Sequence, residues 1–142
     1  LYSMELLEKI HNLAPSVIVK EEENVVGYAL TTPLQAREFH PDLEIMFQNL
    51  EAVQYRNERL FAYSFYCMGQ ICIDKKYRGR GLVDILYQKH KELYSNQFNF
   101  ILTQISCKNQ RSLKAHEKIG FESIYRYRDG TDEWDVVIWD WH

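Results

Sequence analysis

Glycine and arginine alternate at one point of the chain, where a strand-like run gives way to a helix-like run. The stretch reads Tyr77-Arg78-Gly79-Arg80-Gly81-Leu82-Val83. The start of a helix presents backbone N–H groups without intrahelical partners and the positive end of the helix dipole. Glycine lets a phosphate approach that backbone closely, and arginine can bind a phosphate through two hydrogen bonds. The stretch therefore predicts a pyrophosphate-binding loop.

Other phosphate-binding motifs fit this stretch less well. It lacks the Gly-Lys-Ser/Thr ending of a Walker loop, and it lacks the third glycine and the early βαβ position of a dinucleotide-binding fingerprint. A disordered Arg-Gly tract that binds RNA would not have ordered, apolar flanks. A tight turn with solvated arginines is the alternative that the stretch alone leaves open.

The composition of the 142 residues is that of a single globular domain, over residues 1–142. The net charge of −3 gives no reason to expect a large nucleic-acid or membrane-binding surface. Cys67, Cys72 and Cys107 have no metal-ligand spacing, so we expect reduced, buried thiols in a cytoplasmic protein and no metal site. The sequence shows neither a signal peptide nor an apolar run long enough to span a bilayer.

Hydrophobic periodicity predicts a mixed α/β order with strand–helix–strand crossovers in the second half. We expect helices over residues 2–13, 82–94 and 109–119, and a further helix that begins at Pro41-Asp42. We expect strands over residues 17–19, 25–30, 60–74, 98–106, 121–128 and 134–141. Gly69 interrupts the third strand, which predicts a bulge or a close backbone approach.

Two segments resemble motifs of the GNAT superfamily of N-acetyltransferases. Residues 71–83 resemble its acetyl-CoA motif, in which Arg78 and Gly81 match, whereas Val83 stands where glycine or alanine is preferred. Residues 109–121 resemble its second motif, in which an asparagine opens a helix that ends in Lys-x-Gly-Phe. The resemblance is good from about residue 60 to residue 141. The usual first strand and first long helix have no obvious counterpart, so we expect them to precede Leu1.

The resemblance implies a GNAT fold: a mixed, mostly antiparallel central sheet that is splayed between its two central strands, with helices on both faces. It implies acetyl-CoA as cosubstrate, with the pantetheine arm in the gap between residues 63–74 and residues 98–106. A backbone N–H at the bulge, in the region 69–72, would stabilise the oxyanion. The residues expected to bind the cosubstrate are Ile71, Cys72, Ile73, Arg78, Gly79, Arg80, Gly81, Leu82, Val83, Asn109 and Ser112.

The activity that the resemblance implies is transfer of an acetyl group from acetyl-CoA to a primary amine, by direct attack in a ternary complex. His116 stands where the family commonly has a tyrosine that protonates the leaving thiolate, so we expect it to be the general acid. The alternative is that His116 packs beside the pantetheine or caps a contact in the core. Glu58, Tyr66 and Gln70 are candidates for the amine site, and no residue is singled out as the base.

Two other functions remain open at this point. A catalytically silent GNAT-like domain could bind an acyl-CoA as a sensor or scaffold, because Val83 and His116 depart from the family pattern. An RNA-binding module that uses Arg78 and Arg80 is disfavoured by the net charge. The resemblance implies that the acceptor, a small-molecule or peptide amine, is bound largely by residues 33–66. A homodimer is compatible with the sequence.

Overall fold

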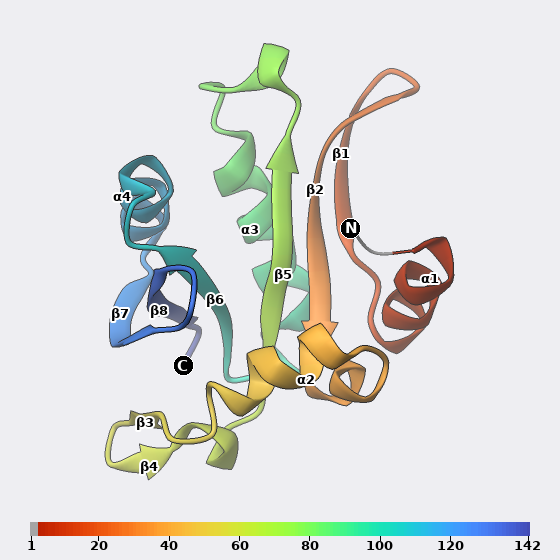
Figure 1. The fold of residues 1–142 in the computed structure, drawn as a ribbon. Helices are drawn as coiled ribbons and strands as arrows, with labels where there is room; N and C mark the ends of the chain where they lie inside the picture. The colour runs from red at the N-terminus through yellow and green to blue at the C-terminus, as the bar shows by residue number, and fades with distance from the viewer. Residues whose placement is uncertain (1–2) are drawn as a thin grey trace.

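A six-stranded sheet of order β1-β2-β5-β6-β8-β7 organises the chain in a computed structural model that describes residues 3–142 (Figure 1). Its strands are β1 (Val17–Glu21), β2 (Asn24–Pro33), β5 (Phe65–Ile73), β6 (Phe100–Ser106), β7 (Glu122–Arg128) and β8 (Glu133–Asp140). Only the β5–β6 pair of this sheet is parallel. The expected mixed, mostly antiparallel sheet is therefore confirmed.

The helices are α1 (Met4–Leu13), α2 (Pro41–Gln48), α3 (Leu82–Tyr94) and α4 (Gln110–Ile119). A separate small hairpin is formed by β3 (Gln54–Tyr55) and β4 (Glu58–Arg59). In Figure 1, α3 lies behind the sheet, whereas α2 lies in front of its lower end. No helix within residues 3–142 is both long and apolar enough to cross a membrane.

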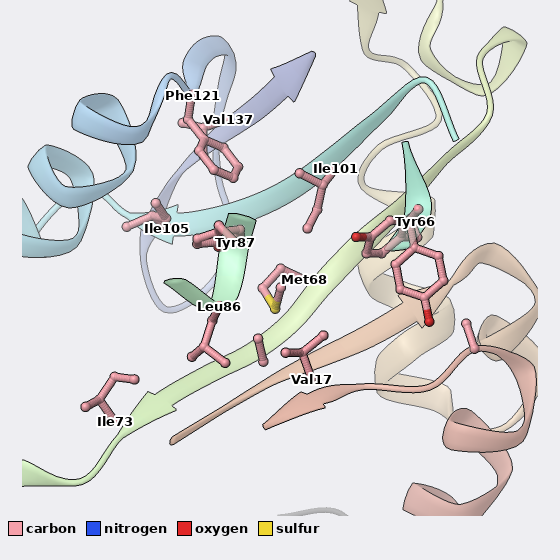
Figure 2. Close-up of a cluster of buried hydrophobic side chains, with 13 residues drawn as sticks. Val17, Tyr66, Met68, Ile73, Leu86, Tyr87, Ile101, Ile105, Phe121 and Val137 are labelled. Carbon is pink, nitrogen blue, oxygen red and sulfur yellow. The ribbon is translucent and has the colours of Figure 1, made fainter. Parts of the chain in front are cut away.

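Successive side chains of a strand point to opposite faces, and this alternation makes two cores. On one face, Tyr66 and Met68 of β5 pack with Leu86 and Tyr87 of α3 (Figure 2). We call this the α3 face. On the other face, Cys67 and Leu102 belong to a cluster that contains residues of α2, and we call this the α2 face. The sheet is thus covered on both sides, as expected.

Most predicted elements are confirmed, including the helix opened by Pro41 and the bulge at Gly69. The predicted strand over residues 60–74 is wrong at its start, because Leu60–Ala62 form a 3-10 turn and β5 begins at Phe65. The β3–β4 hairpin was not predicted; its turn needs positive φ at Arg56 and Asn57.

The cysteines are free, but the expectation that all three are buried is wrong. Cys67 is buried on the α2 face. Cys72 is exposed, since it lies past the part of β5 that is covered on that face, and Cys107 is half-buried after β6.

Candidate active site

The two central strands separate partway along their length. The parallel ladder joins Phe65, Tyr66 and Cys67 to Phe100, Ile101 and Leu102, and ends there. Met68 and residues 70–73 of β5 are then paired with β2, while β6 stays paired to β8. The Thr103 hydroxyl of β6 donates to the Met68 carbonyl oxygen at 3.3 Å, just beyond the end of the ladder. Figure 1 shows β5 and β6 diverging toward the end of the sheet where α3 begins. The backbone of β5 that faces this gap can accept an extended ligand, because its hydrogen-bonding groups need partners.

The gap opens at a β-bulge. The β2–β5 register shifts so that Leu30 pairs with Gln70 and Thr31 with Met68, which leaves Gly69 without an opposite residue. A Cβ on Gly69 would lie 2.4 Å from Thr32 Oγ1, so the two strands approach closely only because residue 69 is glycine. The bulge turns the backbone at Gly69 away from the regular ladder.

The residues after Gly69 present alternate sides of β5. Ile71 and Ile73 point to the α3 face and pack against its core, whereas Gln70 and Cys72 are exposed on the other face. The Asp74 N–H donates to Val26 of β2, so strand alternation turns the backbone groups of Ile71 and Ile73 to the gap and those of Cys72 to β2. Binding of the cosubstrate by these residues stays a prediction.

The loop between β5 and α3 is held open by two left-handed glycines. Gly79 has φ +80° and Gly81 has φ +74°, a region that other residues enter only with strain. Gly81 is the residue before α3 and has no side chain with which to cap it. The first N–H groups of α3 therefore remain available to an anion.

Basic side chains surround this helix start. Arg78 and Arg80 are exposed, and the Arg80 guanidinium lies 4.9 Å from the centre of the Tyr77 ring. Leu82 and Val83 turn inward and pack against the α3-face core, which anchors the first turn of the helix. The arrangement suits a pyrophosphate, because uncapped N–H groups and two exposed arginines occur at the same end of α3.

Asn109 and Ser112 lie together at the start of α4. Asn109 Oδ1 accepts a hydrogen bond of 3.1 Å from the Ser112 backbone N–H, so Asn109 caps the helix. Its amide nitrogen is left to contact other groups. The cap is thus a structural role of Asn109, and its binding of the cosubstrate stays a prediction.

His116 lies inside the protein, with 3% of its surface exposed. Its Nδ1 is 2.8 Å from the Ser112 carbonyl oxygen, which can only accept, so Nδ1 carries the proton. Its Nε2 then accepts from the Tyr87 hydroxyl at 2.7 Å. Burial lowers the pKa of His116, and the bond to Ser112 opposes that shift in part. This neutral histidine ties α4 to α3, a partnership with Tyr87 that the sequence did not reveal.

Two hollows flank Gly69 on the α2 face. The larger, about 1110 Å³, lies between α1 and the strands β1 and β2 and reaches Gly69 and Gln70; we call it the α1 hollow. The smaller, about 300 Å³, lies between α2, β5, β6 and the turn that joins β7 to β8; we call it the α2 hollow. Both hollows end at the bulge.

The three candidates for the amine site are separated by the fold. Gln70 lines the α1 hollow. Tyr66 is buried on the α3 face, where its hydroxyl lies 2.8 Å from His90 Nδ1. Glu58 is exposed on the β3–β4 hairpin. Sequence reasoning missed α1 as a wall of this region, although Glu8 and His11, three positions apart, lie on one side of that helix.

The comparison with protein families decides the relationship of this chain. The profile of the acetyltransferase (GNAT) family matches residues 2–121. The chain belongs to the GNAT family. The gap, the bulge and the glycine loop therefore come from the part of the chain that this family shares. A search among curated proteins gave no match.

Solved structures share the GNAT fold at low sequence identity. The NatC complex bound to Gag peptide and CoA contains a chain that superposes with a TM-score of 0.70 at 15% identity, covering 100% of this chain and 82% of that one. The ribosomal-protein-S18-alanine N-acetyltransferase from Escherichia coli gives 0.65 at 13% identity, over 98% and 77% of the two chains. The protein yncA from Salmonella typhimurium, solved with its cofactor acetyl-CoA, gives 0.65 at 15% identity, over 95% and 69%.

Proposed function

We propose that this protein transfers an acetyl group from acetyl-CoA to a primary amine by direct attack in a ternary complex. Membership of the acetyltransferase family supports the group transfer, and structural relatives solved with acetyl-CoA or with CoA support the cosubstrate. The observation that carries the proposal is the uncapped start of α3 at Gly81, next to a strand whose backbone faces an open gap.

In this proposal the cosubstrate is held at two places. The pyrophosphate binds the N–H groups that follow Gly81, with Arg78 and Arg80 adding charge. The pantetheine arm follows the free side of β5 at Ile71 and Ile73, with Asn109 and Ser112 at the opposite wall. The thioester then reaches the bulge at Gly69, where a backbone N–H stabilises the oxyanion.

Protons have to move at both ends of the reaction. An alkylammonium has an ordinary pKa of about 10.4, so the amine must lose a proton before its nitrogen attacks the carbonyl carbon. The C–N bond forms, the C–S bond breaks, and the sulfur leaves as a thiolate. A thiol has an ordinary pKa of about 8.5, so the thiolate needs only a weak acid or water to become protonated.

His116 is the proposed general acid, and its surroundings define what that role requires. Its only ring proton is on Nδ1 and is donated to Ser112, while Nε2 accepts from Tyr87. To protonate a thiolate, His116 would first have to exchange one of these partners. The alternative is a positioning role, in which the Tyr87–His116 pair fixes α4 against α3.

The uncapped start of α3 beside the open gap also suits a second function, acyl-CoA binding without transfer. A GNAT-like sensor needs the pyrophosphate loop and the gap but no free acid, and His116 is fully engaged. The two functions differ in one measurable respect, the release of free CoA when an amine is supplied.

Calorimetric titration with acetyl-CoA tests the binding step, with the Arg78→Ala/Gly81→Asp double variant beside the parent. We expect micromolar binding by the parent and its loss in the variant, since an aspartate at the helix start repels phosphate and strains φ. Thiol release with butylamine, spermidine and an unblocked peptide then tests transfer. Tight binding without release from any amine would support the sensor, and no binding by the parent would refute both functions.

A further inference from the structure

We propose that this protein accepts acyl groups longer than acetyl, with the acyl chain in the α2 hollow and the amine entering through the α1 hollow. The inference rests on the proposed function, because it takes the thioester to lie at Gly69. It goes beyond that function by assigning each hollow to one substrate and by predicting which acyl donors are preferred.

The geometry of the reacting carbon requires two separate spaces. When the amine nitrogen adds to the thioester carbon, the tetrahedral carbon carries sulfur, oxygen, the acyl chain and nitrogen. Sulfur points back along the gap and oxygen toward the bulge N–H, so chain and nitrogen need the two remaining directions. The intermediate then expels the thiolate, giving an N-acyl amine and free CoA, while the proton of the amine passes to a base or to water. Two hollows that both end at Gly69 match this requirement.

The floor of the α2 hollow suits an aliphatic chain. Cys67 and Leu102 line it with side chains that are at most 2% exposed, whereas Met68, which also lines it, has its side chain in the α3-face core. Thr103 and Gln104 add polar groups to the lining. Ile45 and Met46 of α2 form its apolar wall. Its volume of about 300 Å³ equals that of about ten water molecules in the liquid, so a methyl group would leave most of it unfilled.

The α1 hollow suits the amine. Glu8 and His11 of α1 line it, so it offers an acidic side chain and an imidazole ring as hydrogen-bonding partners for an amine. Gln70 lies at its inner end beside Gly69. Its volume of about 1110 Å³ admits a substantial acceptor. The titratable side chains of this hollow therefore face the path of the amine, away from the floor of the α2 hollow.

Two exposed acidic side chains, those of Asp42 and Asp129, line the α2 hollow. Hydrogen bonds from the backbone N–H groups of Thr131 and Asp132 lower the pKa of Asp129 to about 2, so this carboxylate is negatively charged at neutral pH. An acyl chain that ends in its own carboxylate, such as succinyl, would meet like charge. The structure thus favours neutral chains of about four carbons over both acetyl and succinyl.

The test is the affinity of the purified chain for acetyl-, propionyl-, butyryl-, hexanoyl- and succinyl-CoA, measured by calorimetry without any acceptor. Burying one methylene is worth about fourfold in affinity, and butyryl has two more than acetyl, so we expect butyryl-CoA to bind about 15-fold more tightly than acetyl-CoA. Thiol release with butylamine should follow the same order.

Variants of the α2 hollow supply the control. Met46→Trp should remove the gain in affinity of butyryl-CoA over acetyl-CoA, because the indole would fill the hollow. Ile45→Trp should also remove the preference for butyryl-CoA. The Ile45 side chain is 54% exposed, so this substitution should change the free energy of unfolding little. Leu7→Trp narrows the α1 hollow instead and should leave the chain-length order unchanged, while raising the KM for the amine.

Either of two results would overturn the inference: acetyl-CoA bound as tightly as butyryl-CoA, or a chain-length order unaffected by both tryptophan variants. Failure of the proposed function would look different. In that case no CoA thioester of any length would bind, or all would bind without thiol release.

Discussion

Replacing Gly69 by alanine should damage the bulge by a steric route that a second substitution can reverse. A Cβ at this position would lie 2.4 Å from Thr32 Oγ1, well inside the 3.0 Å below which Cβ contacts are essentially never observed. Thr32 is 1% exposed and its hydroxyl has no hydrogen-bond partner within residues 3–142. It cannot turn toward solvent, so β2 and β5 would have to move apart.

The magnitude follows from packing and from the unpaired hydroxyl. Overpacking of this kind costs about 1–3 kcal/mol of the free energy of unfolding. Thr32→Ala alone should change stability by less than about 1 kcal/mol, because the lost methyl contact is offset by removal of a buried hydroxyl without a partner. In the Thr32→Ala background, the Cβ that Gly69→Ala adds lies 3.4 Å from the Cβ at position 32 and 3.7 Å from Leu30 Cδ2, and both distances are ordinary contacts. Its cost should therefore fall below about 0.5 kcal/mol.

Urea unfolding of the parent, Gly69→Ala, Thr32→Ala and the double variant measures the coupling energy between the two substitutions. Calorimetry with acetyl-CoA reports whether the bulge keeps the shape that the proposed binding needs. Thr32→Val is the matched control, since it keeps a branch in the place of Oγ1 and should not rescue Gly69→Ala. Gly130→Ala is a second control, because a Cβ there meets no atom of residues 3–142 within 4 Å. An unchanged cost of Gly69→Ala in the Thr32→Ala background would refute the steric explanation.

Three further predictions concern the loop and the buried histidines. Gly81→Ala should weaken CoA binding in calorimetry and cost about 1–2 kcal/mol in thermal unfolding, because φ +74° is left-handed; Gly130→Ala should do neither. Burial lowers the pKa of His90 to about 4, so the unfolded chain binds the proton of this side chain more readily than the folded chain does. The contribution of His90 to the free energy of unfolding should be complete above pH 6.5 and should fall by up to about 1.4 kcal/mol per pH unit as the pH drops toward 4. Urea titrations of His90→Gln should show a smaller slope. His116→Phe should lower the free energy of unfolding by about 1–3 kcal/mol, because it leaves the Tyr87 hydroxyl unpaired, and His116→Phe/Tyr87→Phe should recover most of this loss. If kcat instead falls more than tenfold in His116→Phe and does not recover with stability in the double variant, His116 is a general acid.

Local sequence determined the elements of this protein and the loop between β5 and α3. Residues 82–94 have apolar side chains at helical spacing and fold as predicted, since an amphipathic face needs no distant information. Asn109 and Gly120 mark the ends of α4 because capping depends on near neighbours. Gly79 and Gly81 adopt left-handed φ, as glycines in a tight loop can. Gly69 predicted an irregularity inside a strand, but the sequence did not show which residue Gly69 approaches.

Tertiary structure decided what the local pattern leaves open. The hydrogen bond between Tyr87 and His116 spans 29 positions, and the contact between Gly69 and Thr32 depends on a register shift in β2. Residues 60–64 have strand-like composition, yet Leu60 is buried in a 3-10 turn on the α2 face, because packing there outweighs β propensity. The two hollows at the bulge bring α1 and α2 to β5, and no local periodicity specifies where distant helices dock. Short-range sequence thus determined the glycine loop at the start of α3, and only long-range packing decided which residues meet at the bulge.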